Sequence, residues 1–265
     1  MAFTGNEIAL HNGILIPLCG LDTIELNKNT AYAGIRSALD NGIRHIETAA
    51  DYGIEAETAK ALEDCNIPRS SLFITLEING LKNTDATIRS AEASIRRLGL
   101  DYIDLLLMAW NGKEQDHPDN RDVYTAWKAL ESLYKCGNAH AIGIVDFAPW
   151  QVEYLLQEVE IAPMVSLTGI YPGHPDIEIL ESNKEHRILT MAYLPHTIQK
   201  VISSKEISIL AEKHSCKNED IILQYLCQKE CAITTVNGKL YHQPCTLSED
   251  EIRFLDLMKD YGAES

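Results

Sequence analysis

The chain has 265 residues, of which 45% are hydrophobic and 23% charged, and its formal net charge at pH 7 is −16. This composition is that of a globular protein, and the length suits a single (β/α)8 barrel of about 250 residues. The acidic excess argues against nucleic acid and anionic membranes as partners, because both are bound through clusters of Lys and Arg.

The predicted elements begin with a β-hairpin, IALHNGILI at residues 8–16, in which Asn12 and Gly13 have the residue types of a type I′ turn. Eight short apolar runs rich in β-forming residues come next and are predicted to be strands. In chain order these runs cover residues 17–21, 44–49, 72–78, 102–110, 139–147, 163–170, 187–194 and 231–236.

Amphipathic helical patterns separate the runs, and three of them, at residues 30–42, 84–99 and 123–137, each end at a glycine. Thr84 has the residue type of an N-cap. Strands that alternate with helices form a parallel sheet with right-handed crossovers. We therefore predict one domain over residues 1–265, a (β/α)8 TIM barrel with an N-terminal β-hairpin that caps the barrel bottom.

The ends of the predicted strands carry the most informative phrases, since reactive residues of such barrels lie where strands end and loops begin. The phrases are HIETAADYG, LFITLEI, LGLDYIDLLLMAW, AIGIVDF and MAYLP. Their order and spacing resemble those of the aldo-keto reductase family. The resemblance implies an enzyme that reduces carbonyl compounds with NADPH, in which a tyrosine donates the proton with help from a lysine, an aspartate and a histidine.

The family's four catalytic positions are only partly kept in this sequence. The resemblance places the tyrosine at Tyr52 and puts Glu47 where the family has aspartate. The lysine position falls on Glu77, and the histidine position falls on Ala109. One functional group has therefore been lost, and another has changed from a cation to an acid.

The family's cofactor positions are altered as well. The pair that holds the nicotinamide amide falls on Val145 and Asp146, and Asp22 replaces a glycine beside the nicotinamide ribose. Tyr193 matches the position that stacks on the nicotinamide ring. The basic stretch that grips the adenosine phosphate in the family has no counterpart after residues 231–236.

The changed positions place four acids, Asp22, Glu47, Glu77 and Asp146, at the ends of four predicted strands. Two unit charges about 4 Å apart interact by roughly 4 kcal/mol at an effective dielectric constant near 20. We call the barrel opening at these strand ends the mouth. A mouth lined by four acids is expected to repel a phosphate-bearing dinucleotide, so we predict no cofactor. Crowded carboxyl groups also hold a proton at neutral pH, which is what acid–base chemistry needs.

The sequence therefore predicts a former reductase that has lost NADPH-dependent carbonyl reduction and now works as a cofactor-independent acid–base enzyme. Isomerase, lyase (dehydratase) or cyclase chemistry on a small molecule would suit it, and an acidic pocket would favour a cationic one. The predicted catalytic residues are Tyr52, Glu47 and Glu77. The predicted substrate pocket consists of Asp22, Trp110, Asp146, Tyr171 and Tyr193.

Two alternatives remain open. One is a non-catalytic binding or regulatory pseudoenzyme with a protein partner, and the other is a residual NADPH-dependent oxidoreductase. No metal is predicted, because no segment has the spacing of a metal-binding loop. His45 and Asp104 are predicted to be structural.

The expected setting is a monomer in the cytoplasm. Seven scattered cysteines predict reduced thiols, and the N-terminal segment has neither the basic nor the apolar region of a signal peptide. No stretch of about 18 residues is apolar enough to span a membrane.

Overall fold

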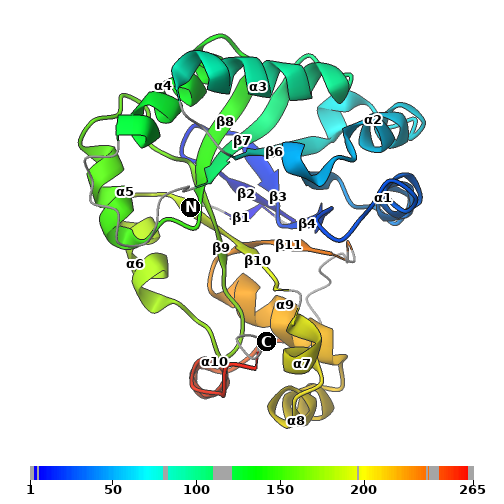
Figure 1. Cartoon of the computed structure of the whole chain (residues 1–265). Helices are drawn as coiled ribbons and strands as arrows, with labels where there is room; N and C mark the ends of the chain where they lie inside the picture. The colour runs from blue at the N-terminus through cyan, green and yellow to red at the C-terminus, as the bar shows by residue number, and fades with distance from the viewer. Residues whose placement is uncertain are drawn as a thin grey trace.

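The computed structural model describes residues 3–4, 6–79, 83–109, 121–195, 197–236, 238 and 245–261. Eight parallel strands close into a barrel, and helices surround it (Figure 1). The strands are β4 (Cys19–Asp22), β5 (His45–Ala49), β6 (Phe73–Ile78), β7 (Ile103–Ala109), β8 (Ala139–Val145), β9 (Val165–Gly169), β10 (Leu189–Tyr193) and β11 (Ala232–Thr235). The predicted (β/α)8 barrel is confirmed, and each of the eight predicted runs contains all or most of one strand.

The helices lie outside the barrel and carry the chain back to the start of the next strand. They are α1 (Ala31–Asp40), α2 (Glu55–Glu63), α3 (Thr84–Arg97), α4 (Arg121–Lys135), α5 (Pro149–Leu156), α6 (Ile177–Glu185), α7 (Ile198–Ile202), α8 (Lys205–His214), α9 (Asn218–Gln228) and α10 (Glu249–Asp256). Two short 3-10 helices, η1 (Ala50–Tyr52) and η2 (Arg69–Ser71), follow β5 and precede β6. No helix in the described ranges combines the length and the apolar character that crossing a membrane requires.

The predicted cap of α3 is wrong by one residue. Asn83 is the N-cap, and its Oδ1 accepts a hydrogen bond of 2.9 Å from the backbone N–H of Ala86. The Thr84 hydroxyl instead donates to the carbonyl oxygen of Thr125 on α4 at 2.8 Å. An asparagine directly before a threonine offers two cap candidates, and the tertiary contact to α4 decides between them.

The hairpin prediction is confirmed, but its turn type is wrong. Strands β2 (Glu7–Ala9) and β3 (Leu15–Pro17) pair antiparallel, and β1 (Phe3–Thr4) adds a third strand beside β2. A type I′ turn needs two residues with positive φ, whereas Gly13 has φ of 87° and Asn12 does not have a positive φ. The Asn12 side chain instead accepts a hydrogen bond from the Ile14 backbone and donates one to the carbonyl oxygen of His140, which fixes the hairpin at the start of β8.

The barrel interior is polar near its centre. His45 is fully buried, and its Nε2 lies 2.8 Å from the Thr75 hydroxyl. Gly20 on the neighbouring strand gives the ring its space, because a Cβ there would lie 2.7 Å from His45 Nδ1. Burial lowers the pKa of His45 to about 3, so the ring is neutral at pH 7. His45 is therefore a buried residue that packs inside the barrel, which agrees with the structural role that the sequence predicts.

Asp104 on β7 ties three segments together. Its Oδ2 accepts hydrogen bonds from Arg69 Nη2 at 2.5 Å and from the Ile74 backbone N–H at 2.8 Å. Both side chains of the ion pair are largely buried, with 13% of Asp104 and 24% of Arg69 exposed. This is the structural role that the sequence predicts for Asp104.

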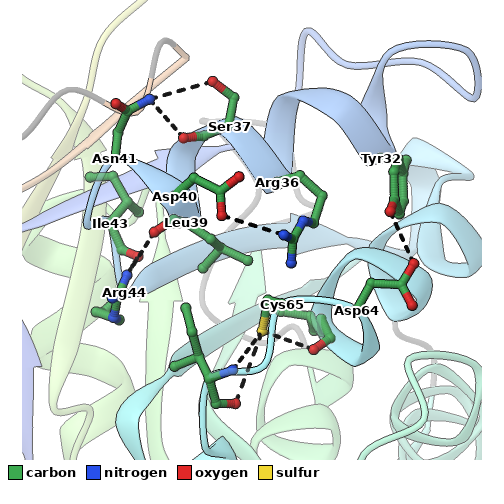
Figure 2. Close-up of polar contacts among 12 residues, drawn as sticks. Tyr32, Arg36, Ser37, Leu39, Asp40, Asn41, Ile43, Arg44, Asp64 and Cys65 are labelled. Atoms are coloured by element: carbon green, nitrogen blue, oxygen red, sulfur yellow. Dashed lines mark hydrogen bonds and ion pairs between the residues drawn. The ribbon is translucent and has the colours of Figure 1, made fainter.

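Replacing Asp104 with alanine is expected to lower the free energy of unfolding by about 2–3 kcal/mol, because Arg69 would keep a half-buried charge without its partner. Urea unfolding measures the change. Asp40→Ala is the matched control, since the Arg36–Asp40 pair on α1 is long at 3.4 Å and its carboxylate is 65% exposed (Figure 2). Equal effects of the two substitutions would contradict the assigned role.

Candidate active site

The predicted acids and the tyrosine gather at the carboxyl end of the barrel. Asp22 is the last residue of β4 and pairs in register with Glu47 of β5, while Ala49 of β5 pairs with Glu77 of β6. Paired residues on neighbouring parallel strands point to the same side of the sheet. Asp22 and Glu47 are 7% and 2% exposed, so their carboxyl groups lie inside the barrel mouth as predicted.

Burial changes the protonation of these acids. It is the main reason why the pKa of Glu47 lies well above its ordinary value, and the charges of Asp22 and Glu77 raise it further. Burial also raises the pKa of Glu77 to about 6, although a hydrogen bond from Asn79 opposes the shift. The mouth therefore carries less negative charge at neutral pH than its four acids suggest.

Asp146 follows β8 and has left-handed backbone geometry, with φ of 52°. Burial raises the pKa of its carboxyl group, while the Tyr193 hydroxyl opposes the shift with a hydrogen bond of 3.3 Å. A residue other than glycine rarely adopts such a backbone, and such residues concentrate at binding sites.

Tyr52 lies in η1, directly after β5, and its phenol is close to the acids of the mouth. Burial raises the pKa of its phenol, and the charges of Asp22, Glu47 and Glu77 raise it further. The phenol therefore stays protonated at neutral pH. In this state Tyr52 can donate a proton or a hydrogen bond but cannot act as a base.

A cavity of about 610 Å³ opens beside the mouth, past the ends of β8, β9 and β10. Three predicted pocket residues, Asp146, Tyr171 and Tyr193, line it together. Asp22 belongs to the mouth and not to the lining of this cavity, and Trp110 lies outside the described residues.

Sequence reasoning missed part of the cavity wall. His174, Asp176 and Glu178 line the cavity from the loop after β9 and the start of α6. His174 Nδ1 lies 3.2 Å from an oxygen of Asp260, and the same carboxylate accepts a hydrogen bond from Tyr171 at 3.0 Å. This contact joins residues 86 positions apart, so no local pattern in the sequence could indicate it.

The described residues fit the nicotinamide end of the family's cofactor. Asp146 offers a carboxylate acceptor for an amide N–H group, and the Tyr193 ring offers an aromatic face. Gly169 leaves room for that ring, since a Cβ there would lie 3.2 Å from it. The raised pKa values of Glu47, Glu77 and Asp146 also reduce the repulsion expected from the sequence. Residues 237 and 239–244, which follow β11, lie outside the described residues.

Comparison with known proteins shows the family to which the chain belongs. Residues 19–195 match the model of the aldo/keto reductase family. The chain belongs to this family, as the resemblance at the strand ends indicates.

Individual relatives agree with this assignment. Glyoxal reductase of Bacillus subtilis is 33% identical over 222 residues, which are 83% of this chain and 78% of the relative. The solved structure of MGS-M4, an aldo-keto reductase enzyme from a deep-sea metagenome library, is 28% identical in sequence and has a TM-score of 0.87. The match covers 98% of this chain and 96% of the MGS-M4 chain. An aldo-keto reductase of Bombyx mori, solved in complex with NADP, is 23% identical with a TM-score of 0.86 over 98% of this chain and 94% of its own, and it shows the shared fold.

These findings contradict the prediction of a cofactor-independent isomerase, lyase or cyclase. The family and the similar relatives are reductases, and they support the alternative of an NADPH-dependent oxidoreductase. The prediction of no cofactor is wrong for the same reason, because a reductase needs a hydride donor. The physical error was to count four full negative charges. Burial raises the pKa of Glu47 well above its ordinary value, that of Glu77 to about 6, and that of Asp146, so these groups ionise less readily than the sequence alone suggests.

The raised pKa of Glu47 makes stability depend on pH. The folded chain holds a proton that the unfolded chain releases, so stability is fully present below the ordinary glutamate pKa of about 4.3 and is lost as the pH rises toward the folded value. Glu47→Gln is expected to raise the melting temperature at pH 8 and to leave it almost unchanged at pH 4. Thermal unfolding across this range measures the effect.

Glu63→Gln, at an exposed position on α2, is the control and should keep the pH dependence of the unmodified chain. Identical melting curves for the unmodified chain and the Glu47 variant at pH 8 would show that Glu47 is not held protonated.

Proposed function

We propose that this protein reduces a small carbonyl compound to an alcohol with NADPH. Tyr52 carries the proposal, because a protonated phenol stands among acids in the mouth of an aldo/keto reductase barrel. The similarity to a glyoxal reductase supports a small aldehyde or ketone as the substrate. Asp146 and Tyr193 would hold the nicotinamide end of the cofactor, which supplies the hydride when bound.

The reaction needs a proton at the carbonyl oxygen, and the Tyr52 hydroxyl would donate it. The family stabilises the resulting phenolate with a lysine cation, a position that is Glu77 in this chain. A protonated Glu77 can stabilise the phenolate by donating a hydrogen bond, whereas an ionised Glu77 opposes the proton transfer by repulsion. Glu77 in its acid form would therefore take over part of the lysine's task.

The rate of reduction should fall as the pH rises through about 6, because Glu77 loses its proton there. We expect kcat/KM for glyoxal to decrease several-fold between pH 5.5 and pH 7.5. Glu77→Gln should flatten this profile, since an amide donates a hydrogen bond without titrating in this range. Steady-state kinetics across the range, followed by NADPH absorbance, measures both effects.

Two further variants test the proton donor and the group beside it. Tyr52→Phe should lower kcat by about 100-fold or more, because it removes the proton donor. Glu77→Lys should raise kcat/KM at pH 7.5, since a cation beside the phenol eases its ionisation. An unchanged rate in Tyr52→Phe would overturn the proposal.

The cavity wall should also select substrates by charge. Asp146, Asp176 and Glu178 line it, so a carboxylate on the substrate would meet negative charge. We expect kcat/KM for neutral glyoxal to exceed that for anionic glyoxylate by about 10-fold or more. Glu178→Gln should lower the ratio of kcat/KM for glyoxal to kcat/KM for glyoxylate, and Glu63→Gln should leave this ratio unchanged. A preference for glyoxylate would contradict the assigned pocket.

We also propose that the enzyme acts as a monomer in the cytoplasm. All seven cysteines are free thiols, which suits a reducing compartment. Gel filtration at micromolar concentration and fractionation of the source cells test the two statements, and a dimer or a secreted protein would overturn them.

A further inference from the structure

A histidine in the cavity wall is fixed from several sides. His174 and Tyr171 lie at the two ends of a tight turn after β9 and exchange backbone hydrogen bonds of 2.8 and 3.2 Å. Their rings stack, with centroids 5.2 Å apart and an angle of 19° between the ring planes. Asp260 joins the two side chains, because one of its oxygens accepts a hydrogen bond from the Tyr171 hydroxyl and the other lies 3.2 Å from His174 Nδ1. These contacts hold the His174 ring in one orientation.

The turn itself is docked tightly on α10 and the residues that follow it. Gly173 at its centre has φ of 88°, a backbone geometry that favours glycine. The Gly173 N–H donates to the carbonyl oxygen of Leu255 at 2.9 Å, and a Cβ on Gly173 would lie only 2.7 Å from the carbonyl oxygen of Lys259. The two segments therefore fit closely, and His174 is in place before any ligand arrives.

The contact with Asp260 determines which part of the ring remains available. A carboxylate only accepts hydrogen bonds, so Nδ1 donates to Asp260 and Nε2 is the nitrogen left for another partner. His174 lines the cavity of about 610 Å³, whereas Asp260 does not, so the part of the ring away from Asp260 borders the cavity. With 47% of the His174 side chain exposed, a ligand in the cavity can reach this nitrogen.

The other polar groups of the wall indicate which ligand group suits His174. Asp146 and Glu178 line the same cavity, and neither Lys nor Arg is found among the described residues of its wall. A hydroxyl group both donates and accepts hydrogen bonds, so it matches Nε2 whether or not that nitrogen carries a proton. A hydroxyl is also neutral, and the acids of the wall do not repel it as they would repel a carboxylate.

We propose that His174 is a specificity-determining residue that binds a hydroxyl group of the substrate, with Asp260 as its positioning residue. The inference rests on the proposed reduction at Tyr52 and narrows its substrates to aldehydes and ketones that carry a hydroxyl group remote from the carbonyl. The hydrogen bond to Nε2 lies away from the reacting atoms, so it stabilises the bound substrate and the transition state alike. Its loss should therefore raise KM more than it lowers kcat.

Matched aldehydes test the proposal. The meta and para isomers of (hydroxymethyl)benzaldehyde differ from the corresponding methylbenzaldehydes by one hydroxyl group, and they cannot close on themselves as hemiacetals. With NADPH and the unmodified chain, we expect kcat/KM to be about 5-fold or more higher for the hydroxymethyl compound in at least one isomer pair. His174→Phe keeps a ring that can stack on Tyr171 but has no nitrogen, so it should bring this ratio to about 1. Equal kcat/KM values within both pairs for the unmodified chain would overturn the proposal.

Binding without turnover separates this inference from the proposed reduction. In the presence of NADP, which cannot donate a hydride, the hydroxymethyl compounds should shift the Nε2 signal of His174 in nitrogen NMR, and the methyl compounds should not. The signal is identified by its loss in His174→Phe. A chain that shows this shift but reduces neither aldehyde would refute the reduction and keep the binding site. A chain that reduces both aldehydes equally and shows no shift would refute the binding site and keep the reduction.

Asp260→Asn tests the positioning role. The Tyr171 hydroxyl would keep the amide oxygen, so the amide nitrogen would face Nδ1 and move the ring proton to Nε2. We expect the nitrogen signals of the ligand-free chain to show this exchange, and the preference for the hydroxymethyl compound to fall several-fold. Unchanged signals and an unchanged preference would overturn the role of Asp260.

His11→Phe is the matched control. His11 is an exposed histidine on the hairpin, with Nδ1 3.4 Å from the carbonyl oxygen of Arg187, and its loss should change neither the ratio nor the signals of His174. Circular dichroism and melting curves check that the variants are folded, and the rates of the unmodified chain do not depend on them. A folded His174→Phe variant that keeps the full preference for the hydroxymethyl compounds would overturn the proposal.

Discussion

Burial of carboxyl groups in the mouth of a closed barrel is the constraint on which the chemistry of this protein depends. A barrel of eight strands brings the ends of β4, β5, β6 and β8 to one opening, so acids far apart in the chain become neighbours. Water reaches Asp22 and Glu47 poorly, and an ionised group there is costly. Proton uptake relieves this cost, and Tyr52 remains a phenol because it is buried and because its neighbours are acidic.

The same constraint would let the proposed reductase work without a lysine and a histidine at the positions that the resemblance assigns to Glu77 and Ala109. The requirement of the reaction is a stabilised proton donor, and a neutral carboxylic acid can supply a hydrogen bond where a cation is missing. A carboxylic acid does this only while it is protonated. The exchange of lysine for Glu77 therefore ties the proposed activity to pH, which a lysine would not do in the neutral range.

Much of the fold could be predicted from the sequence, because most strands are short apolar runs and because α1, α3 and α4 each end two residues before a glycine. The hairpin followed from one Asn-Gly pair, although the side chain of Asn12 and not a type I′ turn decided its geometry. The acids of the mouth were also predictable from their places at strand ends. Their protonation was not, because it depends on burial and on contacts between strands. A contact such as that of His174 with Asp260 joins distant segments and has no local signature.

The hairpin at the other end of the barrel affects how small molecules can reach the site. The hairpin is held to the start of β8 by the hydrogen bond from Asn12. Together with the packed side chains above it, the hairpin closes this end of the barrel. Among the described residues, packed side chains close the hairpin end, so a small molecule would approach Tyr52 from the carboxyl ends of the strands. A ligand bound deeper in the mouth would then have to bind before, and leave after, one bound nearer the opening.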